Sequence, residues 1–398
     1  MMTTKAKPDI RAITRLVPPD GNLVQGQSEL AIDGTLAHAA NEMISTSQNH
    51  YCPAEGTPEL RRAVAEKIRL INGIEIDPDA KPLELIITPG ATGGLVAIAR
   101  TYLVGQAALV FEPYYPYHRR IIEELGGRAE VFTLERDTLQ FNKESLRARC
   151  LELKERASFP LCAIIVCTPV NPTGKVFTRA ELGAIAEICQ ELDLLCLADE
   201  VYEHYVVGAG AHTSIATLPG MWERTVTCNS FSKSWNISGW RLGYTYGNSR
   251  LIAPLNNANN VFYVCAPTPL QKALAQVLVA DPSYYTRLRE RFTGKRQQAV
   301  AVLDRLGFQI YDSGSAFYIW ARIPQEFADA MELNERLIAR AGVAAVPGSA
   351  FTDSDAWDAY MRVCIAREDE VLQNALGKLE RALTGDLRAA QMSATEQG

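Results

Sequence analysis

The middle of the chain alternates short, continuously apolar runs with longer segments of helical periodicity. After the run at 162–169, for example, apolar side chains recur at the spacing of one helix face over 179–192. Continuously apolar strands are typical of parallel sheets, because crossover helices cover both faces of such sheets. The pattern therefore predicts an α/β fold, with a mostly parallel sheet of the seven-stranded type between helices. The runs are LELIIT (83–88), ALVFEP (108–113), CAIIVCTP (162–169), LLCLAD (194–199) and TVTCNSFS (225–232).

The C-terminal part of the chain has a different pattern, in which one long helix over 281–306 is followed by short strands and another helix. It predicts a smaller α+β domain over 281–385, beside a large domain over 48–280. Residues 1–47 are expected to form an N-terminal arm and part of the small domain. The polar residues 386–398 are expected to be a disordered tail.

Composition excludes several classes of protein. The chain has 398 residues, of which 47% are hydrophobic and 22% charged, as in ordinary globular proteins. A net charge of −6 argues against nucleic acid as a partner. No apolar stretch reaches membrane-spanning length, and the first residues lack the apolar core of a signal peptide. Nine cysteines without a CxxC pair and five scattered histidines predict reduced thiols, a cytoplasmic location and no metal site.

Unusual polar or glycine-rich clusters follow the apolar runs. PGATGG follows the first run, YYPY the second and VNPTG the third, while Asp199 ends the fourth and Lys233 follows the fifth. In open α/β sheets, ligands bind outside the carboxyl ends of the strands. Polar loops alone explain one such cluster easily and five of them poorly, so the sequence predicts a ligand site at this edge of the sheet.

The cluster at Gly90, Ala91 and Thr92 stands where a strand gives way to a helix. Free amide groups and the helix dipole make such a turn a seat for an anion. The sequence matches neither GxxxxGK[ST] nor GxGxxG, which disfavours an ATP-type loop and a nicotinamide-binding unit.

Two charged residues at strand ends have a structural and a chemical interpretation. Asp199 could cap a helix, or it could hold a cationic ring nitrogen. Lys233 could be a surface lysine, or a desolvated amine that forms Schiff bases. Ser230 and Ser232 are expected at alternate positions of a strand, and Arg241 offers a guanidinium that suits phosphate. An amine, a carboxylate and several phosphate donors fit one ligand, pyridoxal 5′-phosphate.

Seven motifs in order resemble the class I/II aminotransferases, the aspartate-aminotransferase-like group of fold-type I pyridoxal-phosphate enzymes. The resemblance extends from about Gly26 to about residue 385. The motifs are YCPAEGTPELR, PGATGG, EPYYPY, NPTG, ADEVY, SFSKSWNISGWRLGY and YMRVCIA.

The resemblance implies a role for each residue around the cofactor ring. Lys233 would form the aldimine and later shuttle a proton in quinonoid chemistry. Asp199 would pair with the pyridine nitrogen, and Tyr202 and Asn171 would bond the phenolic oxygen. Tyr115 would stack on the ring. Tyr115 and Tyr202 could instead be core aromatics, and Asn171 could simply start a turn.

The resemblance also implies how the phosphate and the substrate are held. Arg362 would pair with the substrate α-carboxylate, with Asn171 nearby and Gly26 in a loop that covers it. Tyr51 would reach the phosphate of a neighbouring subunit, which implies a homodimer with shared active sites. Arg362 could instead form a surface ion pair, and Tyr51 could be simple packing. The remaining phosphate ligands would be the backbone of Gly90, Ala91 and Thr92, with Ser230, Ser232 and Arg241.

The implied reaction moves an amino group from an L-amino acid to a 2-oxo acid. Two segments depart from the family pattern: GQSELAI (26–32) replaces a GxPDF-like stretch, and NNANNVFYV (256–264) lacks the arginine of dicarboxylate-specific relatives. Phe262 and Tyr263 suggest an apolar or aromatic-tolerant pocket, although dimer packing explains them equally well. Elimination, γ-substitution, cyclisation or oxidative deamination on the same scaffold is the alternative, and a non-catalytic binding protein is the third hypothesis.

Overall fold

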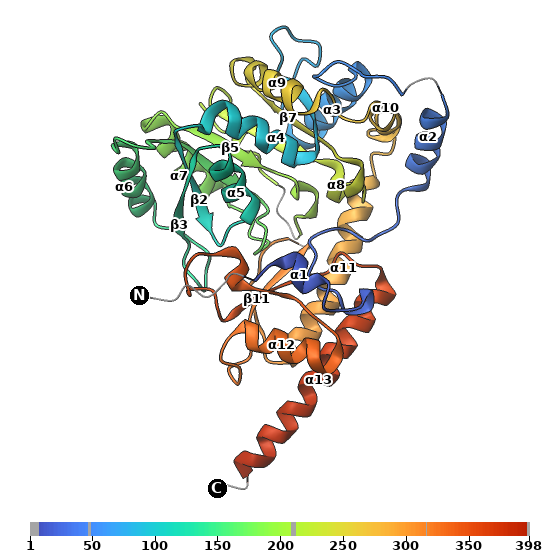
Figure 1. Cartoon of the computed structure of the whole chain (residues 1–398), viewed down its shortest axis with the longest axis vertical. Coiled ribbons are helices and arrows are strands. Elements are labelled where there is room, and N and C mark those ends of the chain that lie inside the picture. The colour runs from blue at the N-terminus through green and yellow to red at the C-terminus, as the bar shows by residue number, and fades with distance from the viewer. Residues whose placement is uncertain (1–7, 47–48, 208–211, 316, 396–398) are drawn as a thin grey trace.

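The computed structural model describes residues 8–46, 49–207, 212–315 and 317–395, which form a large and a small domain (Figure 1). A seven-stranded sheet runs through the large domain, in the order β1-β7-β6-β5-β4-β2-β3. Only β7 runs antiparallel to its neighbours, so the predicted mostly parallel sheet is confirmed. The strands are β1 (Leu85–Pro89), β2 (Ala107–Glu112), β3 (Arg128–Thr133), β4 (Leu161–Cys167), β5 (Leu195–Asp199), β6 (Thr225–Ser230) and β7 (Leu242–Gly247).

Helices cover both faces of this sheet, as continuously apolar strands require. Alternate strand residues face opposite sides: Leu197 packs with one helical layer, and its neighbours Cys196 and Ala198 pack with the other. One layer contains α4 (Gly90–Ile98), α5 (Pro116–Glu124) and α9 (Ser249–Tyr263). The other contains α3 (Pro58–Asn72), α6 (Lys143–Lys154), α7 (Arg179–Glu191) and α10 (Thr268–Val277).

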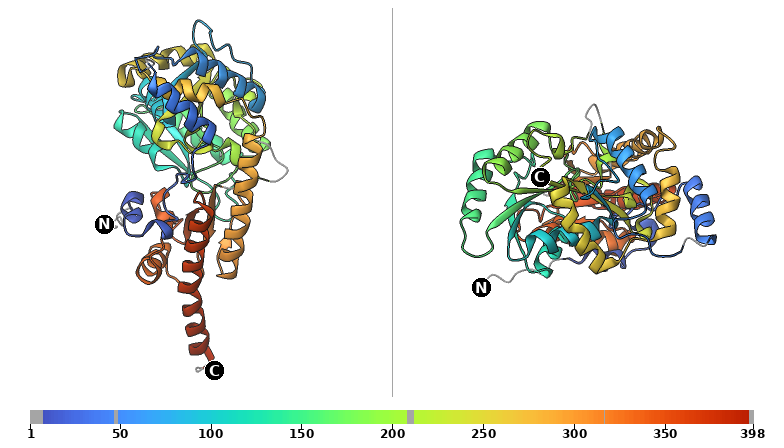
Figure 2. Two further views of the ribbon diagram at one scale, coloured as in Figure 1. Left: turned by 90° about the vertical axis from the view of Figure 1, so that its right-hand side faces the viewer. Right: turned by 90° about the horizontal axis from the view of Figure 1, so that it is seen from above.

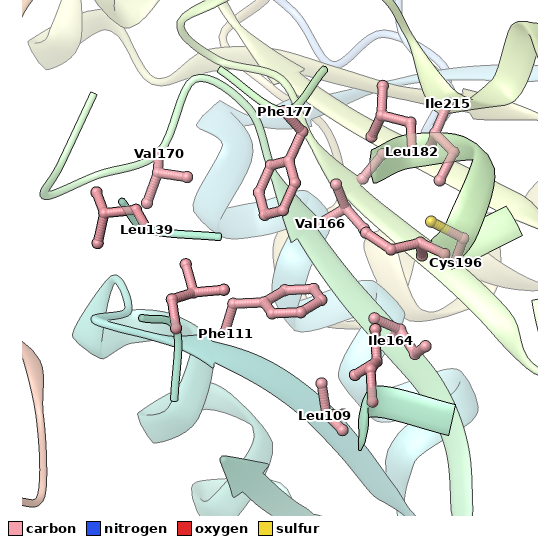
Figure 3. Close-up of a cluster of buried hydrophobic side chains, with 14 of the residues drawn as sticks. Leu109, Phe111, Leu139, Ile164, Val166, Val170, Phe177, Leu182, Cys196 and Ile215 are labelled. Carbon is pink, nitrogen blue, oxygen red and sulfur yellow. The ribbon is translucent and has the colours of Figure 1, made fainter. Parts of the chain in front are cut away.

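The second face carries the core shown in Figure 3. Phe111 of β2 packs against Phe177, with ring centroids 5.4 Å apart, and Leu182 of α7 joins the same cluster. Helix α7 begins where it does because Thr178 and Glu181 form a reciprocal capping box. The apolar face of α7 is thereby fixed against the sheet.

The small domain is built on a four-stranded antiparallel sheet in the order β10-β11-β9-β8. Helix α11 runs alongside both domains, and α13 extends away from them at the C-terminal end (Figure 2). The strands are β8 (Gln309–Ile310), β9 (Tyr318–Arg322), β10 (Val346–Pro347) and β11 (Tyr360–Cys364). The helices are α11 (Tyr284–Arg305), α12 (Ala330–Ala341) and α13 (Asp369–Thr395), with α1 (Ile10–Thr14) nearby.

Two details differ from the expected domain layout. Helix α2 (Gly34–Ser45) packs on α10 and shares a core with α3, so it lies on the large domain rather than the small one. Helix α13 continues through 386–395, most of the segment expected to be a disordered tail, whereas 396–398 lie outside the described residues. Seven of the ten residues in 386–395 are Ala, Leu, Met, Gln or Arg, all of which have high helix propensity. Within the described residues, no helix is long and apolar enough to cross a membrane.

Candidate active site

The start of helix α4 forms an anion seat. Pro89 stands at the cap position and no side chain caps the helix there, so the first amides of 90–92 are free of a cap among the described residues. Gly90 has φ +68°, and a Cβ at this position would lie 2.6 Å from Nη2 of Arg241. The glycine thus lets the guanidinium lie directly against the helix start, where amides and a positive charge favour a phosphate.

Ser230 completes this seat, although not in the predicted way. Strand β6 ends at Ser230 and the short helix α8 (Phe231–Ser234) begins at once, so Ser230 and Ser232 do not alternate along a strand. Ser230 Oγ instead caps α8 by accepting from the Ser232 amide at 3.0 Å, and donates to Ser232 Oγ at 2.8 Å. Gly243 pairs with Ser230 and lies against the Ala91 amide, so Ser230 lies next to the strand that borders the anion seat, and Ser232 is joined to it through Ser230.

Lys233 follows within α8, and its amine points toward the N-terminal segment. Nζ donates a hydrogen bond to the Gly26 carbonyl, 2.6 Å away. Burial lowers the pKa of Lys233 from 10.5 to about 8, and the charges of Arg362 and Arg241 act in the same direction. The backbone is also fixed, since Tyr205 Oη donates to the Lys233 carbonyl at 2.7 Å. A desolvated amine near its neutral form suits reaction with an aldehyde.

Asp199 forms a buried pair with a residue that the sequence did not assign to the site. Nε2 of His118 lies 2.8 Å from Oδ2 of Asp199, and both side chains are buried. The rings of His118 and Tyr115 pack edge to face at 5.3 Å. His118 lies three residues after Tyr115 in helix α5, so helical spacing to a candidate residue was the available signal.

Four further site residues, Tyr202, Tyr318, Arg362 and Asn171, form one connected group. Tyr202 and Tyr318 share a hydrogen bond between their hydroxyls at 2.7 Å, and the guanidinium of Arg362 lies 4.6 Å from the Tyr318 ring centre. Arg362 Nη1 donates to Oδ1 of Asn171 at 2.8 Å. Sequence reasoning missed Tyr318, because its aromatic neighbours in β9 predict only a core strand.

Arg362 is not the surface ion pair that the sequence left open. The residue is 2% exposed and has no carboxylate partner among the described residues. Its Nη2 donates to the Val24 carbonyl at 2.5 Å, while Nε is buried without a hydrogen-bond partner. A buried, unpaired guanidinium is costly, which indicates a place for an anionic ligand.

Tyr51 lies apart from these residues on the surface. The residue is 84% exposed. Tyr51 therefore does not contact the anion seat of its own chain, and the predicted phosphate contact requires a second copy of the chain.

The assembled donor set fits pyridoxal phosphate. It offers uncapped amides beside Arg241 for a phosphate, the amine of Lys233 for an aldehyde and the carboxylate of Asp199 for a ring nitrogen. The fold and site thus define a pyridoxal-phosphate-dependent enzyme of fold type I. Residues 22–379 match the family described as "Aminotransferase class I and II". The chain belongs to this family, and it transfers amino groups with pyridoxal phosphate.

The relatives have several named substrates. The chain is 33% identical to an aspartate aminotransferase of Pyrococcus abyssi, over 86% of each chain. It is 32% identical to the aromatic-amino-acid aminotransferase 2 of Thermococcus litoralis, again over 86% of each chain. The solved N-succinyldiaminopimelate aminotransferase from Mycobacterium tuberculosis superposes with a TM-score of 0.86 at 31% identity, covering 95% of this chain and 97% of that one. The predicted family, fold, cofactor and reaction type are confirmed.

Proposed function

We propose that this aminotransferase acts on an L-amino acid with an apolar or aromatic side chain, and that Lys233, Asp199 and Arg362 carry its chemistry. The observation that carries the proposal is the buried guanidinium of Arg362, which has no acidic partner among the described residues and lies beside Asn171. An α-carboxylate fits a guanidinium in a two-bond fork. Binding there orients the substrate amine and Cα toward Lys233.

The cofactor, when bound, supplies an electron sink that makes the substrate Cα–H bond acidic. Nζ of Lys233 accepts that proton and returns it later, and its pKa of about 8 suits both directions of transfer. Asp199, held by His118, keeps the ring nitrogen protonated. Tyr202 and Asn171 hold the phenolic oxygen, and Tyr115 covers the ring.

The phosphate contacts anchor the cofactor during the exchange. The backbone amides of Gly90, Ala91 and Thr92 offer hydrogen bonds at the start of α4, where the helix dipole adds to the attraction. Arg241 contributes its charge, and the hydroxyls of Ser230 and Ser232 contribute further donors. These groups lie on rigid elements, so they fix the cofactor's orientation against Lys233.

One segment supports a substrate without a second carboxylate. The stretch 256–264 contains no arginine, and it carries the half-buried Tyr263 at the end of α9. Tyr115 stacks on Tyr117 with centroids 5.3 Å apart. We infer that these aromatic residues contact an apolar substrate side chain.

A second copy of the chain would complete the site. Tyr51 and three residues at the end of α9 are large, apolar and exposed, namely Val261 at 82%, Phe262 at 44% and Val264 at 46%. The two segments adjoin, because Nδ2 of Asn259 donates to the Ala54 carbonyl at 2.8 Å. Exposed apolar residues on adjoining segments suit a homodimer in which Tyr51 reaches the partner's cofactor phosphate. All nine cysteines are free thiols, which suits the cytoplasm.

The experiment mixes the holoenzyme with single amino acids in the absence of any oxo acid. The visible absorbance should convert once to that of the amine form and stop, fastest with aromatic or long apolar amino acids. Adding a 2-oxo acid should restore it. Continued turnover with release of ammonia or sulfide contradicts transamination, and a preference for aspartate or glutamate contradicts the proposed substrate class.

A further inference from the structure

A buried ion pair beneath the site takes no part in binding the substrate or moving its proton. Lys67 of α3 contacts Glu203, which opens the short helix η3 (Glu203–Tyr205), and their side chains are only 2% and 1% exposed. Burial alone would raise the pKa of Glu203, but Lys67, His204 and His212 together outweigh burial and hold that pKa well below its usual range. A charged pair this deep is retained only with further hydrogen bonds around it.

One set of these hydrogen bonds connects Glu203 to Ser230, beside the anion seat. Nδ2 of Asn229 donates to Oε1 of Glu203 at 2.6 Å, and Oδ1 of the same Asn229 accepts from the Ser230 amide at 2.7 Å. Asn229 is buried in β6, immediately before Ser230. The carboxylate of Glu203 therefore fixes the rotamer of Asn229, and Asn229 in turn fixes the backbone from which the Ser230 hydroxyl projects.

The carboxylate of Glu203 also fixes the turn that carries Tyr202 and Tyr205. Tyr202 immediately precedes Glu203, and its hydroxyl meets that of Tyr318. Tyr205 ends η3 and donates to the Lys233 carbonyl. Nδ2 of Asn72 and Nζ of Lys67 approach Glu203 from α3, so this helix holds the turn from below. Glu203 thus cross-links the segment of Tyr202 and Tyr205 to the segment of Ser230 and Lys233.

Metal binding by this cluster is the weaker interpretation. Ligand atoms of Glu200, Glu203 and His212 lie within 4.8 Å of one another, all of them buried. However, Lys67 already neutralises Glu203, and Nε2 of His212 lies 3.3 Å from Glu200. Burial lowers the pKa of His212, but the carboxylates of Glu200 and Glu203 together raise it above its ordinary value. Lys67 and His212 therefore both oppose the negative charge of the two carboxylates, which weakens the case for a metal ion there.

We propose that Glu203, paired with Lys67, is a positioning residue that aligns the phosphate ligand Ser230 and the ring ligand Tyr202 around one cofactor. The inference rests on the proposed roles of Ser230 and Tyr202. It differs from a purely stabilising role because it predicts effects on the cofactor's environment, and not only on folding.

Four variants test it: Glu203→Gln, Lys67→Met, the double variant, and Arg61→Met as the control. Arg61 is a buried cation on the same helix α3, but it pairs with Asp79 and Glu55 instead. Glu203→Gln keeps the side-chain shape, and the double variant buries no unpaired charge, so at least one altered protein should fold. Each protein is assayed for its dissociation constant for pyridoxal phosphate, the pH midpoint of its visible absorbance and its unfolding free energy.

We expect Glu203→Gln to raise the cofactor dissociation constant about tenfold, the loss of roughly one charge-assisted hydrogen bond. The absorbance midpoint should move by about half a pH unit or more, because Tyr202 is displaced. Arg61→Met should lower stability without either change. If Glu203→Gln and the double variant lose stability but keep the wild-type affinity and midpoint, the inference is overturned. If the wild-type protein forms no visible band, the proposed roles of the site residues fail, and this inference fails with them.

Discussion

Nζ of Lys233 donates a hydrogen bond to the carbonyl oxygen of Gly26, 2.6 Å away, although 207 positions separate the two residues. The loop at Gly26 therefore lies over the amine that we assign to the chemistry. The same glycine touches Tyr318, whose hydroxyl would collide with a Cβ at position 26. Tyr318 in turn contacts Tyr202 and Arg362, so this loop joins the cofactor and substrate sides of the site.

Gly26→Ala should therefore impair catalysis without unfolding the protein. The added methyl group displaces either the loop or Tyr318, and a shift of this kind can lower kcat/KM about a hundredfold. Steady-state kinetics and thermal unfolding measure both effects. Gly34→Ala is the matched control, because a Cβ at Gly34 has no atom within 4 Å. Equal kinetics for the two variants would show that the loop at Gly26 has no part in catalysis.

Arg362→Lys should weaken substrate binding and spare the cofactor. A lysine keeps the positive charge but loses the two-pronged geometry that matches a carboxylate, as well as the contact with Asn171. We expect KM for the amino acid to rise roughly tenfold to a hundredfold, with the cofactor affinity unchanged. An unchanged KM would show that the substrate carboxylate binds elsewhere.

Uptake of cofactor by the apoenzyme should depend on pH with a midpoint near 8. Burial lowers the pKa of Lys233 from 10.5 to about 8, and only the neutral amine attacks an aldehyde. The rate at which visible absorbance appears after mixing measures the midpoint. A midpoint near that of an exposed lysine would contradict the assignment of a desolvated amine.

The same pKa shift predicts how the stability of the apoprotein depends on pH. The unfolded chain keeps the Lys233 proton up to about pH 10.5, whereas the folded protein loses it near pH 8. The unfolded state thus binds more protons in this window, so the unfolding free energy contributed by Lys233 rises from about pH 8 to 10.5. Denaturant unfolding of the apoprotein should show this rise relative to Lys233→Met, and parallel curves would refute it.

Asp199→Asn should lower the rate of the amino-acid half-reaction by about a hundredfold or more, since a neutral amide does not hold a protonated ring nitrogen. His118→Gln should have a smaller effect in the same direction, because it removes only the partner that orients Asp199. Single-turnover absorbance measurements compare the two variants. If His118→Gln is the more damaging change, Asp199 is not the residue that keeps the ring nitrogen protonated.

Phe262→Glu should dissociate the proposed dimer. A buried, unpaired carboxylate at an apolar interface is unfavourable, and Phe262 belongs to the exposed patch with Tyr51. Light scattering measures the mass, and activity should fall together with the dimer fraction. A wild-type protein that is a monomer and fully active would exclude shared active sites.

Much of the site could be predicted because its residues follow apolar runs. Asp199 and the serine–lysine segment stand where buried strands end, and a parallel sheet brings such ends to one edge. Two sets of contacts could not be predicted, because they join elements far apart in the sequence. They are the pairing of His118 with Asp199 and the contacts of Tyr318. Helical spacing places His118 near Tyr115, but it does not show that His118 contacts Asp199.

The sequence also does not show where β6 ends or that Lys67 and Glu203 form a buried pair. The sequence predicts Ser230 and Ser232 in one strand, but β6 ends at Ser230, whose hydroxyl caps α8, and Ser232 lies in that helix. The apolar run continues through Phe231, so periodicity alone does not show where the strand stops. The buried network of Lys67 and Glu203 gave no signal either, since Lys67 lies on a helix whose other charged residues are mostly exposed.

The most direct test reduces the holoenzyme with borohydride and maps the modified peptide by mass spectrometry. Borohydride converts the carbon–nitrogen double bond between enzyme and cofactor into a stable link. We predict one modified residue per chain, Lys233, in the peptide that contains SFSKSW. A modified lysine anywhere else, or no modified lysine in a protein that binds the cofactor, would contradict the account.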